Sequence, residues 1–82
     1  NEDRLNSISL IGGIYLKQNN PDEAFKQFKK VLKKREDSRI YNYLAKTSIL
    51  QKKFKKANKY ISLSKQTADE KGFLTLIELL YH

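Results

Sequence analysis

The feature that most constrains this chain is a pattern that occurs twice, with a constant offset of 33 residues between the copies. Ala24 of the first copy corresponds to Ala57 of the second, and Phe28 corresponds to Ile61. Repetition at this spacing is the signature of stacked supersecondary units, each of which buries its apolar face against a neighbour. The pattern therefore predicts a repeat architecture, and it favours a surface that holds another molecule over a catalytic centre.

The periodicity within each copy is helical, because no stretch of the chain sustains the strict alternation that a strand requires. We therefore expect an all-α fold with five helices, at about 3–18, 21–34, 39–52, 54–69 and 72–82. The strongest start signal is the run Asn-Pro-Asp-Glu at 20–23, with an N-cap residue, proline at the first helical position and two acids facing the helix dipole. Asp37 or Ser38 is expected to cap the third helix.

Each of the first four helices carries an apolar stripe at three-to-four-residue spacing, which is expected to be its buried face. The stripes are Leu5, Ile8, Ile11, Ile14 and Tyr15; Ala24, Phe25, Phe28, Val31 and Leu32; Ile40, Tyr41, Leu44, Ala45, Ser48 and Ile49; and Phe54, Ala57, Tyr60, Ile61, Ser64 and Ala68. Gly12 lies within the first stripe, although glycine costs roughly 1 kcal/mol of helix propensity relative to alanine. We therefore expect another helix to approach closely at Gly12.

The residue types needed for catalysis or metal binding are scarce in this chain of 82 residues. There is no cysteine, and the single histidine is the last residue, His82, so a protein-built zinc site is excluded. Acids occur as pairs at 2–3, 22–23, 36–37 and 69–70, where helix starts and turns are predicted, and capping explains them. We predict a protein that is not an enzyme and that uses no cofactor and no metal.

The formal net charge is +8, and fourteen of the seventeen basic residues are lysine. Lysine is a solvated point charge, whereas arginine is favoured for bidentate recognition of phosphate, so this bias indicates a solvated face more than a nucleic-acid surface. No apolar run approaches the roughly 20 residues of a membrane span, and no signal-peptide pattern is present. These features predict a cytoplasmic protein without a membrane span.

The spacing and the residues of the two copies resemble the tetratricopeptide repeat, a helix pair with a period of about 34 residues. The first copy carries Ile11-Gly12-x-x-Tyr15, Ala24 and Phe28; the second carries Leu44-Ala45, Ala57 and Ile61, with Ser48 where the family has tyrosine. The resemblance implies an α-solenoid of antiparallel helix pairs, forming one domain over residues 1–82. Repeat one would cover about 5–37 and repeat two about 38–70, followed at about 72–82 by a capping helix or the first helix of a third repeat. Both ends of the sequence look cut, so we expect a piece of a longer array.

The resemblance also implies where a partner binds, because the first helix of each pair lines a concave groove in this family. The groove residues that we predict to bind a protein or peptide, acidic ones included, are Asn6, Ser9, Lys17, Arg39, Asn42, Lys46 and Ile49, and Thr75 and Leu79 would extend the groove. Arg39, Asn42 and Lys46 share one helical face. Asparagine can hydrogen-bond the backbone of an extended peptide, and lysine and arginine can bind a carboxylate.

Three functions remain open from the sequence. The leading prediction is a non-enzymatic scaffold module that binds a protein or peptide. One alternative is the peptide-sensing receptor part of a transcriptional regulator, and another is a basic helical nucleic-acid-binding domain. The segment Phe73–Tyr81 is apolar on more than one side, so we expect it to pack against downstream helices or against another copy of the chain.

Overall fold

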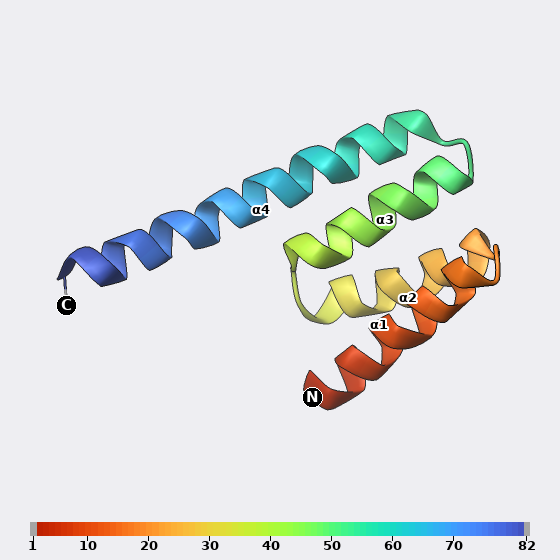
Figure 1. Ribbon diagram of the computed structural model, residues 1–82, viewed down its shortest axis with the longest axis horizontal. Helices are drawn as coiled ribbons and strands as arrows, with labels where there is room; N and C mark the ends of the chain where they lie inside the picture. Colours follow the sequence, from red (N-terminus) through yellow and green to blue (C-terminus); the bar gives the residue numbers. More distant parts are fainter. Residues whose placement is uncertain (1, 82) are drawn as a thin grey trace.

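The structure, a computed structural model, describes the backbone of residues 2–81 and the side chains of residues 3–68. Within this range the chain forms four helices and no strand: α1 (Glu2–Lys17), α2 (Pro21–Lys34), α3 (Ser38–Leu50) and α4 (Phe54–Tyr81). Each helix packs against the next one along the chain, so that two antiparallel hairpins lie side by side (Figure 1). The all-α prediction is confirmed, whereas the prediction of five helices is wrong.

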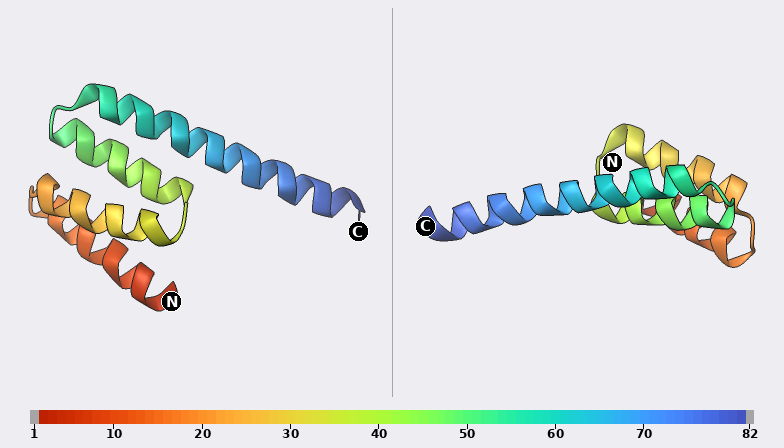
Figure 2. Two further views of the ribbon diagram at one scale, coloured as in Figure 1. Left: turned by 180° about the vertical axis from the view of Figure 1, so that it is seen from behind. Right: turned by 90° about the horizontal axis from the view of Figure 1, so that it is seen from above.

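The fourth and fifth predicted helices are one continuous helix, α4, whose C-terminal half extends beyond the hairpins (Figure 2). The boundary between α2 and α3, which lies 33 residues earlier, shows why α4 is not divided. There, α3 begins after Asp37, and aspartate is a good N-cap residue. The position in α4 that corresponds to Asp37 holds Glu70 instead. Arg35, at the end of α2, likewise corresponds to Ala68, the best helix former. Gly72 is tolerated within a helix at a cost of roughly 1 kcal/mol. No stop signal or start signal therefore separates the two segments.

The start of α3 is fixed by Asp37, as the sequence predicts. Oδ1 of Asp37 accepts a hydrogen bond of 2.8 Å from the backbone N–H of Arg39, which satisfies one of the unpaired donors of the first turn. The same buried carboxylate also lies 3.2 Å from the guanidinium of Arg39 and 3.6 Å from that of Arg35. Asn20 precedes α2 at the predicted position but makes no side-chain capping bond, so α2 begins there mainly because of Pro21.

The two turns within the hairpins share one backbone geometry at the 33-residue offset. In the first turn Asn19 has φ of 58°, and in the second turn Lys52 has φ of 62°. Asn20 N–H donates to the carbonyl of Tyr15 at 2.8 Å, and Lys53 N–H donates to that of Ser48 at 2.8 Å. This is the Schellman arrangement, which satisfies the carbonyls at a helix end through one left-handed residue. Each turn therefore forms without glycine, because these hydrogen bonds offset the conformational cost of a positive φ at Asn19 and Lys52.

The core lies between the helices and is built mostly from the predicted stripes. Its buried apolar members are Ala24, Phe28, Val31, Ile40, Tyr41, Leu44, Ala45 and Tyr60, with Leu5, Ile8, Tyr15, Leu16, Phe25, Leu32 and Leu63 partly buried against them. Six predicted stripe residues are instead exposed: Ile11, Ile14, Ile49, Phe54, Ile61 and Ala68. The apolar residues of these helices therefore span a wider arc than the neighbouring helices cover.

A side chain of α2, Phe28, packs directly on Gly12 of α1, in agreement with the close helix contact predicted there. A Cβ atom at Gly12 would lie 2.7 Å from a ring carbon of Phe28, nearer than real Cβ contacts come. The Phe28 ring is fully buried and stacks on the ring of Tyr43 from α3, with 5.0 Å between centroids and 5° between planes. At Gly13, by contrast, an added Cβ would meet no atom within 4 Å. Only the first glycine of the pair is therefore required by packing.

A tyrosine pair joins α3 to α4 at the other side of the core. The rings of Tyr41 and Tyr60 lie 6.3 Å apart, and the hydroxyl of Tyr41 donates a hydrogen bond of 2.9 Å to a carboxylate oxygen of Glu36. Burial, followed by this hydrogen bond to Glu36, raises the pKa of Tyr41 to about 12. Burial also raises the pKa of Tyr60. Both hydroxyls are therefore held in the neutral form.

The fold is expected to lose stability as the pH rises above about 10. In the unfolded chain Tyr41 ionises near its ordinary pKa of about 10, whereas the folded protein keeps the proton until the pKa of about 12. The stabilisation is complete below pH 10 and is lost between these two values, because the unfolded state then binds fewer protons. Urea unfolding between pH 9 and 11 measures how the free energy of unfolding falls with pH. In the variant Tyr41→Phe this fall should be less steep. Equal declines in the variant and the parent would contradict the assignment.

Candidate binding groove between α1 and α3

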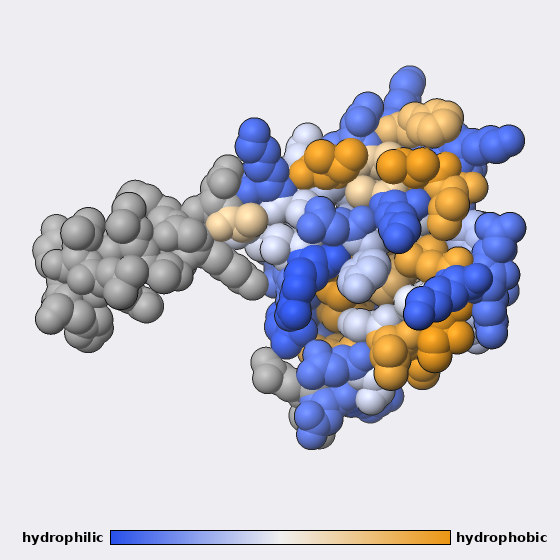
Figure 3. Space-filling view, in the orientation of Figure 1, coloured by the Kyte–Doolittle hydropathy of each residue, from blue (hydrophilic) through white to orange (hydrophobic). Residues whose placement is uncertain are grey.

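A groove of about 630 Å³ runs between α1 and α3, the first helices of the two hairpins. Its lining residues are Asn6, Ser9, Leu10, Gly13, Ile14, Leu16, Lys17, Tyr43, Lys46 and Leu50, and we refer to it as the α1–α3 groove. The space-filling view shows apolar surface along part of α1, interrupted by hydrophilic side chains (Figure 3). The first helices of the two hairpins therefore line a common hollow.

The floor of the α1–α3 groove is apolar and open to solvent. Leu10 is 68% exposed, Ile14 46%, Leu50 43% and Tyr43 42%. Large apolar side chains gathered at such exposure mark binding surfaces in small proteins. Tyr43 is held rigid by its stacking on the buried Phe28 ring, so this part of the floor is formed before any ligand arrives.

Two cations, Lys17 and Lys46, border this apolar floor from α1 and α3 respectively. Neither lysine forms an ion pair with any side chain among residues 3–68. The charge of each is therefore open to a ligand. An apolar floor with two cations at its edge fits a segment that carries apolar side chains and a carboxylate.

The seven predicted site residues do not all meet in this groove. Asn6, Ser9, Lys17 and Lys46 line it, whereas Arg39 and Asn42 lie with Tyr43 and Lys46 around a shallower hollow of about 270 Å³ next to it. Ile49 is exposed and lines neither hollow. The side chains of Thr75 and Leu79 lie outside the described residues, and the continuous α4 carries that segment away from the hairpins (Figure 1).

The polar groups of three predicted site residues already have partners within the chain. The Arg39 guanidinium is paired with Asp37, and this hydrogen bond raises the pKa of Arg39. The hydroxyl oxygen of Ser64 in α4 lies 2.7 Å from Oδ1 of Asn42, so this amide joins α3 to α4. The Ser9 hydroxyl donates to the carbonyl of Leu5 in its own helix at 3.0 Å. Of the predicted residues, Asn6, Lys17 and Lys46 are the best placed to contact a ligand in the groove.

The sequence interpretation missed most of the apolar floor. Tyr43, Lys46 and Leu50 follow each other at intervals of three and four residues, and so do Leu10, Ile14 and Lys17. This spacing places each set along one helical face, which was the available signal. Ile14 was instead assigned to the core, and Leu10 and Tyr43 were assigned neither to the core nor to the groove.

No family model matches the chain, and no curated protein or solved structure matches it at a significant level. Among the described residues, no cluster of three or more His, Cys, Asp or Glu side chains could hold a metal ion. None of the helices described in residues 2–81 is long and apolar enough to span a membrane. The groove itself is therefore the basis for a functional proposal.

Proposed function

We propose that this protein is a tetratricopeptide-like scaffold module that binds an extended segment of another protein in the α1–α3 groove. The observation that carries this proposal is the combination of exposed Leu10, Ile14 and Tyr43 with two lysines that have no acidic partner among the described side chains. A soluble domain gains nothing in stability from such a surface. A ligand that covers it gains both apolar burial and charge pairing.

The geometry favours a peptide over a small metabolite. The groove is open along its length and is shared by two helices, so it can follow a chain, whereas sites for small molecules enclose most of their ligand. Asn6 and Lys17 lie along α1 at the groove, and Asn6 can donate to and accept from a peptide backbone. The peptide-sensing receptor alternative would use this same groove and differs in what the bound peptide controls.

The groove can be tested with a phage-displayed library of random ten-residue peptides selected on the intact chain. We expect the selected peptides to combine apolar residues with Asp or Glu. The double variant Leu10→Ser/Lys46→Gln should weaken their binding by about tenfold or more, since it removes apolar burial and one charge pair. Fluorescence polarisation with labelled copies of the selected peptides measures the dissociation constants.

The matched control is Phe54→Ser/Lys59→Gln, which removes one exposed apolar side chain and one charge from α4, outside the groove. This control should change the dissociation constants less than twofold. If the selected peptides bind the groove variant as tightly as the parent chain, the groove assignment is wrong. Circular dichroism of both variants establishes that the helices are retained.

A further inference from the structure

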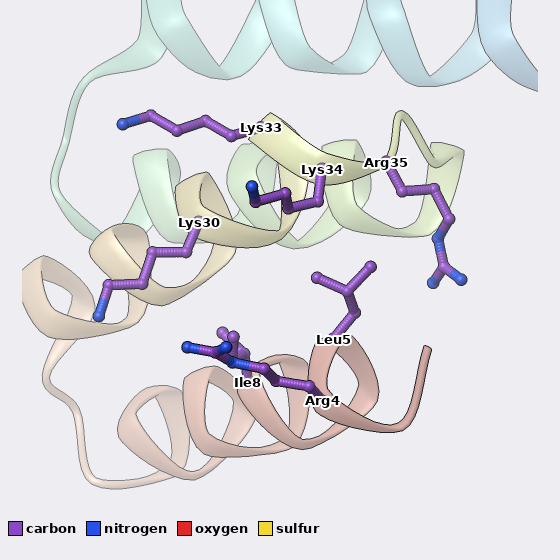
Figure 4. Close-up of a pocket in the computed structure, with 7 residues that line it drawn as sticks. All are labelled: Arg4, Leu5, Ile8, Lys30, Lys33, Lys34 and Arg35. Atoms are coloured by element: carbon purple, nitrogen blue, oxygen red, sulfur yellow. The ribbon is translucent and has the colours of Figure 1, made fainter. Parts of the chain in front are cut away.

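A second hollow, of about 750 Å³, lies between the N-terminal part of α1 and the last turns of α2 (Figure 4). It is lined by Arg4, Leu5, Ile8, Lys30, Lys33, Lys34 and Arg35, and we refer to it as the α1–α2 basic cleft. None of these residues lines the α1–α3 groove. Any ligand that it holds would therefore be bound separately from a ligand of the groove.

Cations from both helices gather over this cleft. Figure 4 shows Arg4 and Lys30 extending into the space between α1 and α2, whereas Lys34 lies along α2 and Lys33 lies on the other side of α2. The guanidinium of Arg35 is drawn towards Asp37 at 3.6 Å. Neither Lys30 nor Lys34 has an ion-pair partner among the described side chains. Like charges on one surface repel one another, so an anion bound beside Lys30 and Lys34 relieves part of that repulsion.

The apolar character of the floor of the cleft indicates which class of anion is complementary to it. Leu5 and Ile8 are half-buried against the core and present aliphatic surface to the cleft, and the lysine stems add to it. No aromatic ring among the described side chains lines the cleft, so these residues offer nucleic-acid bases no stacking platform. A phosphodiester backbone also offers no apolar group for Leu5 and Ile8. A peptide that alternates carboxylates with an apolar side chain complements both the rim and the floor.

We propose that the α1–α2 basic cleft binds an acidic segment of a partner protein. Its carboxylates pair with Lys30 and Lys34, and an apolar side chain of the segment covers Leu5 and Ile8. Charge complementarity selects the acidic partner and speeds its association, while the apolar contact distinguishes the segment from other polyanions. The binding is strongly weakened by salt, because the rim charges are exposed.

The test uses the intact chain and two fluorescein-labelled peptides of equal charge. One peptide has four Glu-Glu-Leu repeats, and the other has four Glu-Glu-Ser repeats. We expect the leucine peptide to bind at least fivefold more tightly than the serine peptide. The variant Lys30→Gln/Lys34→Gln should bind the leucine peptide about tenfold more weakly than the parent chain, since it lacks two charge pairs. The groove variant Leu10→Ser/Lys46→Gln should retain this binding, which separates this proposal from that for the groove.

The matched control is Lys55→Gln/Lys59→Gln, which removes an i, i+4 lysine pair from α4 and changes the net charge equally. This control should lower the affinity for the leucine peptide less than twofold. Equal weakening by both lysine variants would overturn the proposal in favour of a general charge effect. Equal affinity for the two peptides, or no binding of either at low salt, would also overturn it. A DNA duplex that binds more tightly than the leucine peptide and responds to Lys30→Gln/Lys34→Gln would assign the cleft to nucleic acid instead.

Discussion

Replacing Phe28 with alanine is expected to lower the free energy of unfolding by about 3–5 kcal/mol. The Phe28 side chain is fully buried, lies against Gly12 of α1 and stacks on Tyr43 of α3, so its removal leaves a cavity where α1, α2 and α3 meet. A domain of this size has a total stability of only about 5–15 kcal/mol. The variant should therefore lose a large share of its stability and unfold at a much lower urea concentration than the parent chain. Urea unfolding followed by circular dichroism measures the loss.

Phe54→Ala is the control for Phe28→Ala, because the same side chain is removed at a position that is 61% exposed. It should cost less than about 1 kcal/mol, in keeping with substitutions that create no cavity. A comparable loss of stability in the two variants would contradict the placement of Phe28 at the meeting point of the three helices.

Gly12→Ala and Gly13→Ala are expected to change stability in opposite directions. At Gly12 the new methyl group would press on the immobile Phe28 ring, and overpacking of this kind costs about 1–3 kcal/mol, which exceeds the helix propensity gained. At Gly13 the methyl group meets no atom, so the helix gains about 0.5–1 kcal/mol. The two midpoints of urea unfolding should therefore lie on either side of that of the parent chain.

Measuring Gly12→Ala in a chain that also carries Phe28→Leu identifies why Gly12→Ala lowers stability. Leucine at position 28 lacks the ring carbons that lie closest to Gly12, so Gly12→Ala should be neutral or stabilising in the presence of Phe28→Leu. Residues in direct contact show such non-additive effects, whereas independent sites do not. If Gly12→Ala costs the same in both backgrounds, contact with the Phe28 ring is not the reason for the cost.

Local signals in the sequence were sufficient to predict the first three helices. The bounds of α2 agree with the prediction because proline and two acids mark its start, and Asp37 caps α3 as expected. The division of α4 was wrong because the Asp-Glu pair before Gly72 was assigned to a helix start or turn, although glutamate is a poor N-cap. The 33-residue offset held for the turns but not for this boundary, because Glu70 and Ala68 replace the residues that end α2 and begin α3.

The candidate site was less predictable than the fold. The tetratricopeptide resemblance assigned Lys17 and Lys46 to the first helices of the pairs, and both residues line the α1–α3 groove. It could not show that the guanidinium of Arg39 pairs with Asp37, or that the amide of Asn42 contacts Ser64 across the helix interface. Tyr43 was missed for a related reason, because its stacking partner Phe28 is 15 residues away in sequence. Polar and aromatic pairings of this kind depend on tertiary contacts.

The continuous α4 also changes how this protein behaves hydrodynamically. Its 28 residues span about 42 Å, roughly twice the length of the 13-residue α3 beside it. The radius of gyration is 14.1 Å, whereas a compact domain of this length has about 12 Å. A single chain should therefore elute from a sizing column ahead of globular proteins of equal mass. Light scattering, which reports mass independently of shape, is the measurement that distinguishes an elongated monomer from a pair associated through 73–81.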